Sequence, residues 1–419
     1  MTSTTSTSSA TKWIGEVPSG WRVLEPRRVF SLRREPERPG DIHLTPSQKY
    51  GVLPQEEYVA ITGSQVVRNL SGTTMQHVEA GDFISHLRTF QGGLELAKQA
   101  GKVSPAYTVV TPGPEAFPNY YKYVLKSRGY ISQIASVTDQ LRDGQSMRFP
   151  EFNETWLPVP PFEEQKLIAD YLDRETAEID AFISDSEQMA RLVDERRKAE
   201  RSVLLRRLNK RVPLKRKARL VTGGTPQEIS TTTDSDGVFW IKPGDIGAGR
   251  DGTKGNIKLT PHSASQLPAV ESEAVVVVGI GSVGKVGFMV PPFVTNQQIT
   301  TVIPLGSTDP AFLYHVLADS EQWIRNSANG TTLPIINNSI LGLVPTPDIP
   351  QPEQAEIVEF LDAKERQASE AIAELESAIQ LAKERRSALI SVAVTGQIDV
   401  AAQGVSAAEQ LRDELEVHL

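Results

Sequence analysis

The stretch VVVVGIGSVGKVGF, residues 275–288, has the spacing that most suggests phosphate chemistry in this 419-residue chain. Gly279, Gly281 and Gly284 fit the pattern G-x-G-x-x-G, and Lys285 follows them as in the loops that cradle nucleotide phosphates. Such glycines bind a pyrophosphate only where they open a helix inside a βαβ unit. The residues that follow the loop therefore decide what it can bind.

Those residues favour a strand over a helix. Val286, Phe288 and Val290 alternate as in a β-strand, and the pair Pro291–Pro292 would end any helix within two turns. Val286 also stands where a phosphate loop carries the serine or threonine that binds magnesium. The sequence therefore predicts a β-hairpin turn here and no nucleotide site.

Other residue types that carry out chemistry show no catalytic arrangement. The chain has no cysteine, which excludes disulfides, thiolate catalysis and cysteine-bound zinc. Paired carboxylates such as Glu163–Glu164 fall at a predicted helix start, where the helix dipole favours negative charge. The histidines lack ligand spacing, so we expect each to be structural or solvated and predict no metal site: His43, His77, His86, His262, His315 and His418.

Composition predicts a cytoplasmic protein with locally basic parts. The chain has a net charge of −8, but residues 1–150 are net basic, and residues 351–419 carry most of the acidic excess. Phosphate binding needs a basic face and not a basic protein, so the total charge excludes no nucleic-acid partner. No apolar run is long enough to span a membrane, and residues 1–12 are predicted to form a disordered lead without a secretory signal.

A tandem duplication organises the sequence. EQKLIADYLD at 164–173 aligns without a gap with EQAEIVEFLD at 353–362, and at the same offset ERR at 195–197 meets ERR at 384–386. Agreement in one register over such a length predicts two copies of one structural unit. Each copy has a front part and a helical back part.

The back parts predict long helices and the front parts predict α+β domains. Leu361, Ala368, Ile379 and Ala382 belong to a heptad-like apolar stripe in the second helical segment, and a less regular stripe in the first segment includes Met189. Prolines precede each helical segment. Because one long helix cannot bury its apolar stripe alone, we expect the two helices to pair with each other. The fronts, rich in Gly, Pro, Thr and Val, predict short strands and turns, with short helices at 118–135 and 310–326.

The order of these elements resembles the specificity subunit of type I restriction–modification systems. The motifs that carry the likeness run along most of the chain: WIGEVPSGW at 13–21, VPPFEEQ at 159–165, FWIKPGDI at 239–246, TNQQI at 295–299 and VTGQID at 394–399. Each motif is moderately specific, and their order and duplication strengthen the resemblance.

The resemblance implies a non-catalytic subunit that reads DNA. It implies an α+β chain in which two target recognition domains alternate with two long helices, which pair as an antiparallel coiled coil in a pseudo-twofold repeat. The implied boundaries are a lead at 1–12, recognition domains at 13–160 and 211–350, helices at 161–210 and 351–396, and a tail at 397–419.

Its implied partners are double-stranded DNA, two modification (methyltransferase) subunits and ATP-dependent restriction subunits. Each recognition domain would read one half of a bipartite asymmetric target, and the helices would set the spacing and dock the methyltransferases. No cofactor is expected in this chain, because S-adenosylmethionine, ATP and magnesium would bind to the partner subunits.

Two sets of residues are candidates for contacts. Arginine and lysine read guanine or phosphate and asparagine and glutamine read adenine, so the DNA candidates are Arg88, Gln91, Arg142, Gln145, Arg148, Arg250, Lys254, Lys285, Asn296, Gln297 and Asn329. The partner-binding candidates on the helices are Gln165, Arg196, Gln354 and Arg385. For the DNA set the alternative is plain solvation, and for the helix set it is capping and pairing across the coil.

Two readings from other classes of protein remain open. The chain could be a duplicated coiled-coil scaffold that joins proteins and reads no DNA, or a nucleotide-using enzyme built on the Gly279 loop. Salt-sensitive affinity for duplex DNA excludes the pure scaffold. Binding of ATP or NAD to the isolated chain would support the hypothesis of a nucleotide-using enzyme.

Overall fold

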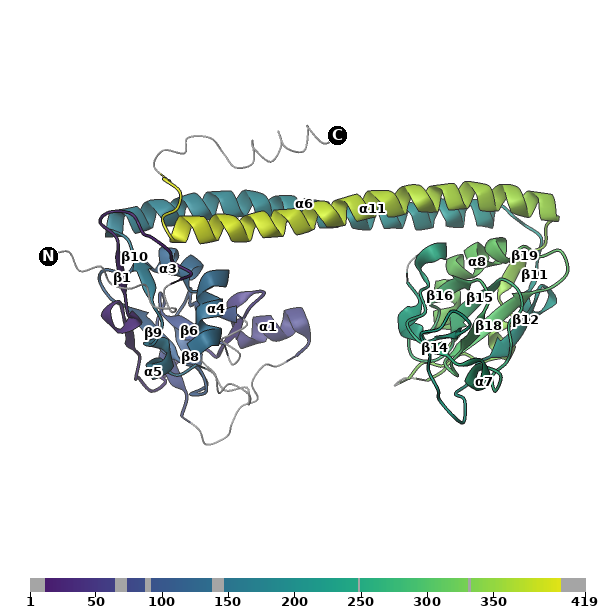
Figure 1. Ribbon diagram of the computed structural model, residues 1–419, viewed down its shortest axis with the longest axis horizontal. Coiled ribbons are helices and arrows are strands. Elements are labelled where there is room, and N and C mark those ends of the chain that lie inside the picture. Colours follow the sequence, from purple (N-terminus) through teal and green to yellow (C-terminus); the bar gives the residue numbers. More distant parts are fainter. Residues whose placement is uncertain are drawn as a thin grey trace. The chain divides into compact units, whose positions relative to one another are not determined.

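The computed structural model describes residues 12–64, 74–86, 92–137, 147–247, 249–330 and 333–400. They form two compact units, one of Met1–Asp185 with Ile379–Leu419 and the other of Ser186–Ala378. We call these unit 1 and unit 2. Each unit holds part of helix α6 (Phe162–Arg206) and part of helix α11 (Gln351–Val394) beside a mixed α/β domain (Figure 1). Among the described residues no helix is long and apolar enough to cross a membrane.

The domain of unit 1 is built on an antiparallel sheet. Its described strands are β1 (Arg22–Leu24), β2 (Phe30–Leu32), β3 (Leu44–Ser47), β4 (Gly51–Pro54), β5 (Gln76–Val78), β6 (Phe83–Ser85), β7 (Leu94–Leu96), β8 (Gly101–Val103), β9 (Val109–Pro112) and β10 (Leu157–Val159). Its helices before α6 are α1 (Gln55–Thr62), α3 (Pro118–Val124), α4 (Arg128–Val137) and α5 (Phe149–Phe152). The largest described sheet has the order β2-β9-β6-β7, and β1 pairs with β10.

Unit 2 repeats this pattern. Its strands are β11 (Arg211–Pro213), β12 (Ala218–Thr222), β13 (Val238–Ile241), β14 (Lys258–Leu259), β15 (Ala274–Val278), β16 (Val286–Met289), β17 (Phe293–Thr295), β18 (Ile299–Pro304) and β19 (Pro345–Pro347). Besides its parts of α6 and α11, its described α-helices are α7 (Pro261–Ala264), α8 (Pro310–Asp319), α9 (Glu321–Asn326) and α10 (Asn338–Leu341). The sheet order β12-β18-β15-β16 and the pair β11–β19 match the order and the pair of unit 1.

Strand β15 shows why an unbroken valine run forms the centre of this sheet. All five residues of Ala274–Val278 are fully buried. Val275 and Val277 pack into one hydrophobic core, whereas Val276 and Val278 pack into another on the opposite face. Because successive side chains of a strand point to opposite faces, a strand buried on both faces needs apolar residues throughout.

The predicted long helices are present, and most of the apolar stripe is their least exposed face. Leu361, Ala368, Ile379 and Ala382 on α11 are buried, as the heptad spacing predicts. Met189, which the spacing of α6 also places in the stripe, is 53% exposed, so that part of the prediction is wrong. The nearest buried residue along α6 is Ser186, so a short polar side chain occupies the buried face of the helix at this point.

Each predicted short helix is broken in two by a serine. The segment 118–135 forms α3 and α4, and Ser127 Oγ donates to the carbonyl oxygen of Val124 between them. The segment 310–326 forms α8 and α9, and Ser320 Oγ donates to the carbonyl oxygen of Val316. Serine hydroxyls compete for main-chain groups in this way and favour helix ends over helix interiors.

Candidate nucleic-acid interface

The glycine loop is the predicted hairpin turn. Strands β15 and β16 pair antiparallel on either side of it, with Val277 opposite Val286. The amide groups that a nucleotide cradle would offer are occupied, because Gly279 N donates to Gln298 O at 2.7 Å and Gly281 N donates to Pro334 O at 3.1 Å. The loop therefore has no free amide cradle for a pyrophosphate at these positions.

Among the first-domain DNA candidates, only Arg148 lies within the described residues. Arg88, Gln91, Arg142 and Gln145 lie outside them. Arg148 precedes α5, where its backbone N–H donates to Glu151 Oε2 at 2.7 Å, and its side chain is exposed. It remains a candidate for DNA contact.

Arg250 and Lys285 are engaged within unit 2. Arg250 Nη1 lies 2.8 Å from Asp362 Oδ2 on α11, and its guanidinium stacks 5.3 Å from the centre of the Phe288 ring. Lys285 Nζ donates to Ile246 O at 3.0 Å. Arg250 would have to leave its carboxylate partner in order to read a base, so the structure favours a structural role for this residue.

The remaining second-domain candidates divide into buried and exposed side chains. Asn296 is buried, and its side-chain Oδ1 accepts from the backbone N–H of Gln298 at 3.1 Å, which makes it part of a turn. The exposed candidates are Lys254, Gln297 and Asn329. Gln297 Oε1 accepts a hydrogen bond from Thr225 at 2.7 Å, which holds the amide at the domain surface.

Two of the partner-binding predictions are wrong. Gln165 is fully buried, and Gln354 is 2% exposed, so neither side chain can contact another subunit. Each amide instead makes hydrogen bonds inside its own unit. The bonds are the same in both copies, and they explain why the glutamine of EQ recurs in the repeat.

The shared pattern fastens each domain to its long helix. Gln165 Oε1 accepts from Phe117 N at 2.8 Å, and its Nε2 donates to the carbonyls of Glu115 and Pro160. Gln354 Oε1 accepts from Asp309 N at 2.8 Å, and its Nε2 donates to the carbonyls of Ser307 and Ile349. Phe117 and Asp309 are the residues just before α3 and α8. We call each such set of contacts a joint.

A second contact in each joint comes from the sixth residue of the short helix. In unit 1, Tyr123 Oη donates to Asp173 Oδ1 at 2.6 Å. In unit 2, His315 Nε2 lies 2.8 Å from Asp362 Oδ1. Asp173 and Asp362 are the aspartates of the repeated LD motif, and sequence reasoning assigned them no function. Their recurrence at one offset was the signal that could have identified them.

Around His315 the joint of unit 2 becomes a buried ion-pair network. Burial alone would raise the pKa of Asp362, but the hydrogen bond from His315 and the charge of Arg250 outweigh it, so this pKa lies below its ordinary value. Glu365 pairs with Arg197 Nη1 at 2.9 Å and accepts from the Tyr314 hydroxyl. His315, Asp362 and Glu365 have the donor atoms of a metal site within 4.8 Å of one another. Two arginines already neutralise the carboxylates, so the geometry favours an ion-pair network over a metal centre.

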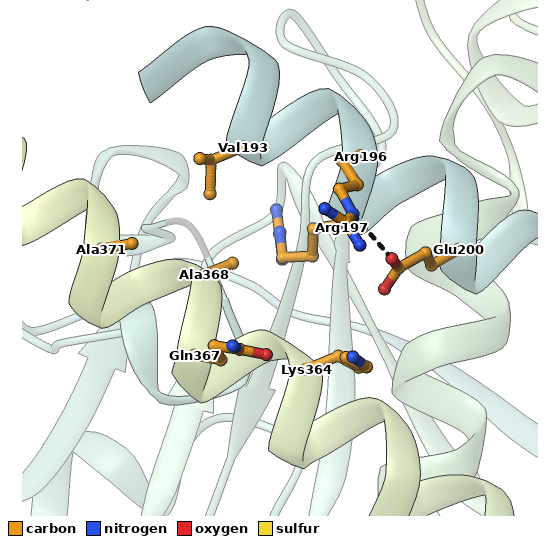
Figure 2. Close-up of a pocket in the computed structure, with 8 residues that line it drawn as sticks. All are labelled: Val193, Arg196, Arg197, Glu200, Lys364, Gln367, Ala368 and Ala371. Carbon is orange, nitrogen blue, oxygen red and sulfur yellow. Dashed lines mark hydrogen bonds and ion pairs between the residues drawn. The ribbon is translucent and has the colours of Figure 1, made fainter. Parts of the chain in front are cut away.

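The other two partner-binding candidates are accessible to different degrees. Arg196 is exposed and pairs with Glu200 at 2.9 Å, and Arg385 is half-buried. A groove of about 230 Å³ lies between α6 and α11. Figure 2 shows Arg196 at this groove, with Val193 facing the small side chains of Ala368 and Ala371. The small alanines leave the space that forms the groove. Nothing in the structure tests contact with a partner, so Arg196 and Arg385 remain predictions.

Comparison with known proteins identifies the class of domain. Residues 219–381 match the family model of the type I restriction modification DNA specificity domain. This region holds most of the domain of unit 2, together with the joint that Asp362 and Gln354 form. No curated protein matches the chain.

Solved structures extend the likeness beyond that region. A chain from work on the structural basis of complex assembly and conformational transition of the type I R-M system is 16% identical, with 91% of this chain and all of that chain covered and a TM-score of 0.65. The HsdS subunit from Thermoanaerobacter tengcongensis is 18% identical, with coverage of 93% and 100% and a TM-score of 0.46. The S subunit from M. genitalium is 15% identical, with coverage of 91% and 97% and a TM-score of 0.35.

At these identities the first likeness shows a shared fold, and the two lower TM-scores add no argument. The family match and the shared fold together confirm the resemblance to the specificity subunit of type I systems. The family match supports DNA sequence recognition by the matched region.

Proposed function

We propose that this chain is the non-catalytic DNA-recognition subunit of a type I restriction–modification complex. The observation that carries the proposal is the match of residues 219–381 to a DNA specificity domain. The repeated joint supports a second recognition domain in unit 1, because Gln165 and Gln354 fasten equivalent domains by the same three contacts.

In this proposal residues 13–160 and 211–350 are the two target recognition domains, and each reads one half of a bipartite asymmetric target. The helices at 161–210 and 351–396 pair antiparallel and set the distance between the halves. One contact within each unit supports the antiparallel orientation of α6 and α11. Asp180 of α6 meets Arg386 near the end of α11 in unit 1, and Arg197 of α6 meets Glu365 near the start of α11 in unit 2.

The proposed partners are two methyltransferase subunits, which dock on the helices, and ATP-dependent restriction subunits. S-adenosylmethionine, ATP and magnesium act on those subunits in this scheme. In the second domain we assign three exposed residues to DNA contacts: Lys254, Gln297 and Asn329. Lys254 suits a phosphate, whereas Gln297 and Asn329 suit an adenine edge.

The test is the affinity of the full chain for duplex DNA across a salt series. We expect log affinity to fall linearly with log salt, because binding releases counterions from the phosphates. Lys254→Ala should reduce the salt slope by about one, since a single phosphate contact is lost. Arg191→Ala, on an exposed position of α6, is the control and should leave the slope unchanged. Affinity that is absent or insensitive to salt would favour the scaffold.

A further inference from the structure

Within the part of the chain that the structure describes, Arg201 is a buried cation with no ion pair to a carboxylate. Arg201 lies on α6 and is 8% exposed, and its Nη2 donates to the carbonyl oxygen of Ala318 at 3.0 Å. Its Nε is buried and has no hydrogen-bond partner among the residues that the structure describes. Burying a charge without a counter-charge is costly in free energy, so this guanidinium favours a bound anion.

Arg201 lines a cavity of about 290 Å³ between α6 and the domain of unit 2. Strand β16 and helices α8 and α9 supply the facing wall. Four more basic side chains line this cavity: Arg197, Lys198, Lys285 and Arg325. A space of this size holds several water molecules or one small anion with its hydration.

The acidic side chains of the lining do not neutralise all of these cations. Asp194 lies 2.7 Å from Lys198 and 2.6 Å from Arg197. Glu321 pairs with Arg325 at 2.5 Å. Arg201 and Lys285 have no ion pair within the described ranges, so the cavity keeps an excess of positive charge.

The cavity has an accessible mouth and a buried floor. The side chains of Lys198 and Arg325 are 53% and 52% exposed, which opens one side to solvent. Arg201 and Tyr314 also line the cavity and are buried. An anion entering from solvent would therefore meet the exposed cations Lys198 and Arg325 before the buried guanidinium of Arg201.

Lys285 reaches this cavity through the hairpin turn. Gly284 has a φ of 90°, and a Cβ there would meet the backbone oxygen of Glu321 at 3.0 Å. Glycine thus lets helix α9 and Arg325 pack closely against the turn. Lys285 lines the cavity wall, and its Nζ donates to Ile246 O. The backbone amides of Gly279 and Gly281 bond to protein carbonyls instead, so the side chain of Lys285 is the group of this motif that faces the cavity.

The pKa of Arg201 also indicates that nearby negative charge does not balance its buried positive charge. Its pKa is lowered from the ordinary value, chiefly by burial, with Arg197 acting in the same direction. Tyr314, Asp319 and Glu365 act in the opposite direction and do not outweigh these effects.

We propose that this cavity is a phosphate-binding site, with Arg201 and Lys285 as its principal ligands. A guanidinium fork matches two phosphate oxygens, and an ammonium supplies a point charge beside it. The phosphate comes either from a free phosphate ion or from the DNA backbone. The assignment rests on the cavity's own residues and not on the proposed function.

The probe is inorganic phosphate, titrated into the full chain by calorimetry against chloride at equal ionic strength. We expect phosphate-specific binding that weakens about tenfold in Lys285→Met and in Arg201→Met, because each change removes a charge-assisted hydrogen bond. Arg191→Met removes an exposed charge of the same helix outside this cavity and should bind phosphate as the unaltered chain does. Lys285 is half-buried on a turn, so its variant carries the test if the Arg201 variant does not fold.

Two arms identify the source. If the site takes a DNA phosphate, phosphate competes with duplex DNA, and Lys285→Met lowers the salt slope by about one. If it takes a free phosphate ion, DNA affinity is the same in the variant. Either result supports the site. No preference for phosphate over chloride, or a preference that persists in both cavity variants, would overturn it.

Discussion

The two joints have the same frame and different chemistry. Gln165 and Gln354 make matching hydrogen bonds, so the backbone geometry at the start of α3 and α8 is the same in both units. The sixth residue of each short helix then differs. Tyr123 meets Asp173 in a joint that Thr176 completes at 3.1 Å. His315 meets Asp362 in a network that includes two arginines.

This difference separates the contacts that fasten each α/β domain to its long helix from the contacts that differ between the two domains. The glutamines contact main-chain atoms, which any domain sequence supplies. The side chain at the sixth position contacts the aspartate side chain of its own unit, so the two copies can diverge there without loss of the glutamine contacts. The joint of unit 2 should consequently be more sensitive to the loss of one charge, because its members are more deeply buried.

The largest expected effect follows from the shared frame. Gln354→Leu leaves a buried N–H and two carbonyls without partners, and we expect the free energy of unfolding of unit 2 to fall by about 3 kcal/mol. Gln165→Leu should have a similar effect on unit 1. Gln367→Leu, at an exposed position of α11, serves as the control. Hydrogen exchange at α3 and α8 reports each unit separately, and equal protection in Gln354→Leu and the control would contradict the shared frame.

A smaller effect distinguishes the two joints. Asp362→Asn removes the charge that faces Arg250 and His315, and we expect a loss of about 2 kcal/mol, since one partner of a buried pair remains. Asp173→Asn keeps a hydrogen-bond acceptor for Tyr123 at a more exposed site, so the loss should be about 1 kcal/mol or less. Denaturant unfolding measures both. A larger loss for Asp173→Asn would reverse the comparison.

The smallest effect concerns pH and falls on unit 1 alone. Burial alone would lower the pKa of His77, but hydrogen bonds to Asp41 and Glu79 outweigh it, so this pKa lies above its ordinary value. Its contribution to stability is therefore complete below the unfolded pKa of about 6.5 and is lost as the pH rises through the folded pKa. Protection factors in β5, which correct for the intrinsic rise of amide exchange with pH, should fall above that pH and should lose this dependence in His77→Gln. An unchanged pH profile in the variant would show that another group titrates.

Features that depend on local pattern could be predicted from the sequence. The hairpin at Gly279–Gly284, the long helices after the proline pairs, and the duplication all follow from residue spacing, because strand and helix periods differ. The buried position of Met189 was predicted wrongly, since the apolar spacing of α6 is irregular and Ser186 takes the stripe position.

Features that depend on tertiary contact could not be predicted. EQ at 164–165 and 353–354 looks the same whether the glutamine faces a partner or a main-chain N–H, and only the packing of α3 and α8 decides between them. Arg250 sits in a polar loop typical of DNA contact, yet the aspartate that binds it lies over one hundred residues away. The excess of positive charge around Arg201 could not be predicted for the same reason, because the charged side chains come from three separate segments, α6, the hairpin turn and α9.

The central claim is that the two recognition domains read separate halves of one DNA target. We would replace residues 212–349 with the equivalent segment of another specificity subunit and map adenine methylation across the host genome by single-molecule sequencing. The account predicts a motif of two short halves separated by a fixed gap, of which the replacement changes one half and leaves the other. A motif that changes in both halves, or a map that is the same with and without this gene while the complex fails to bind duplex DNA, would contradict it.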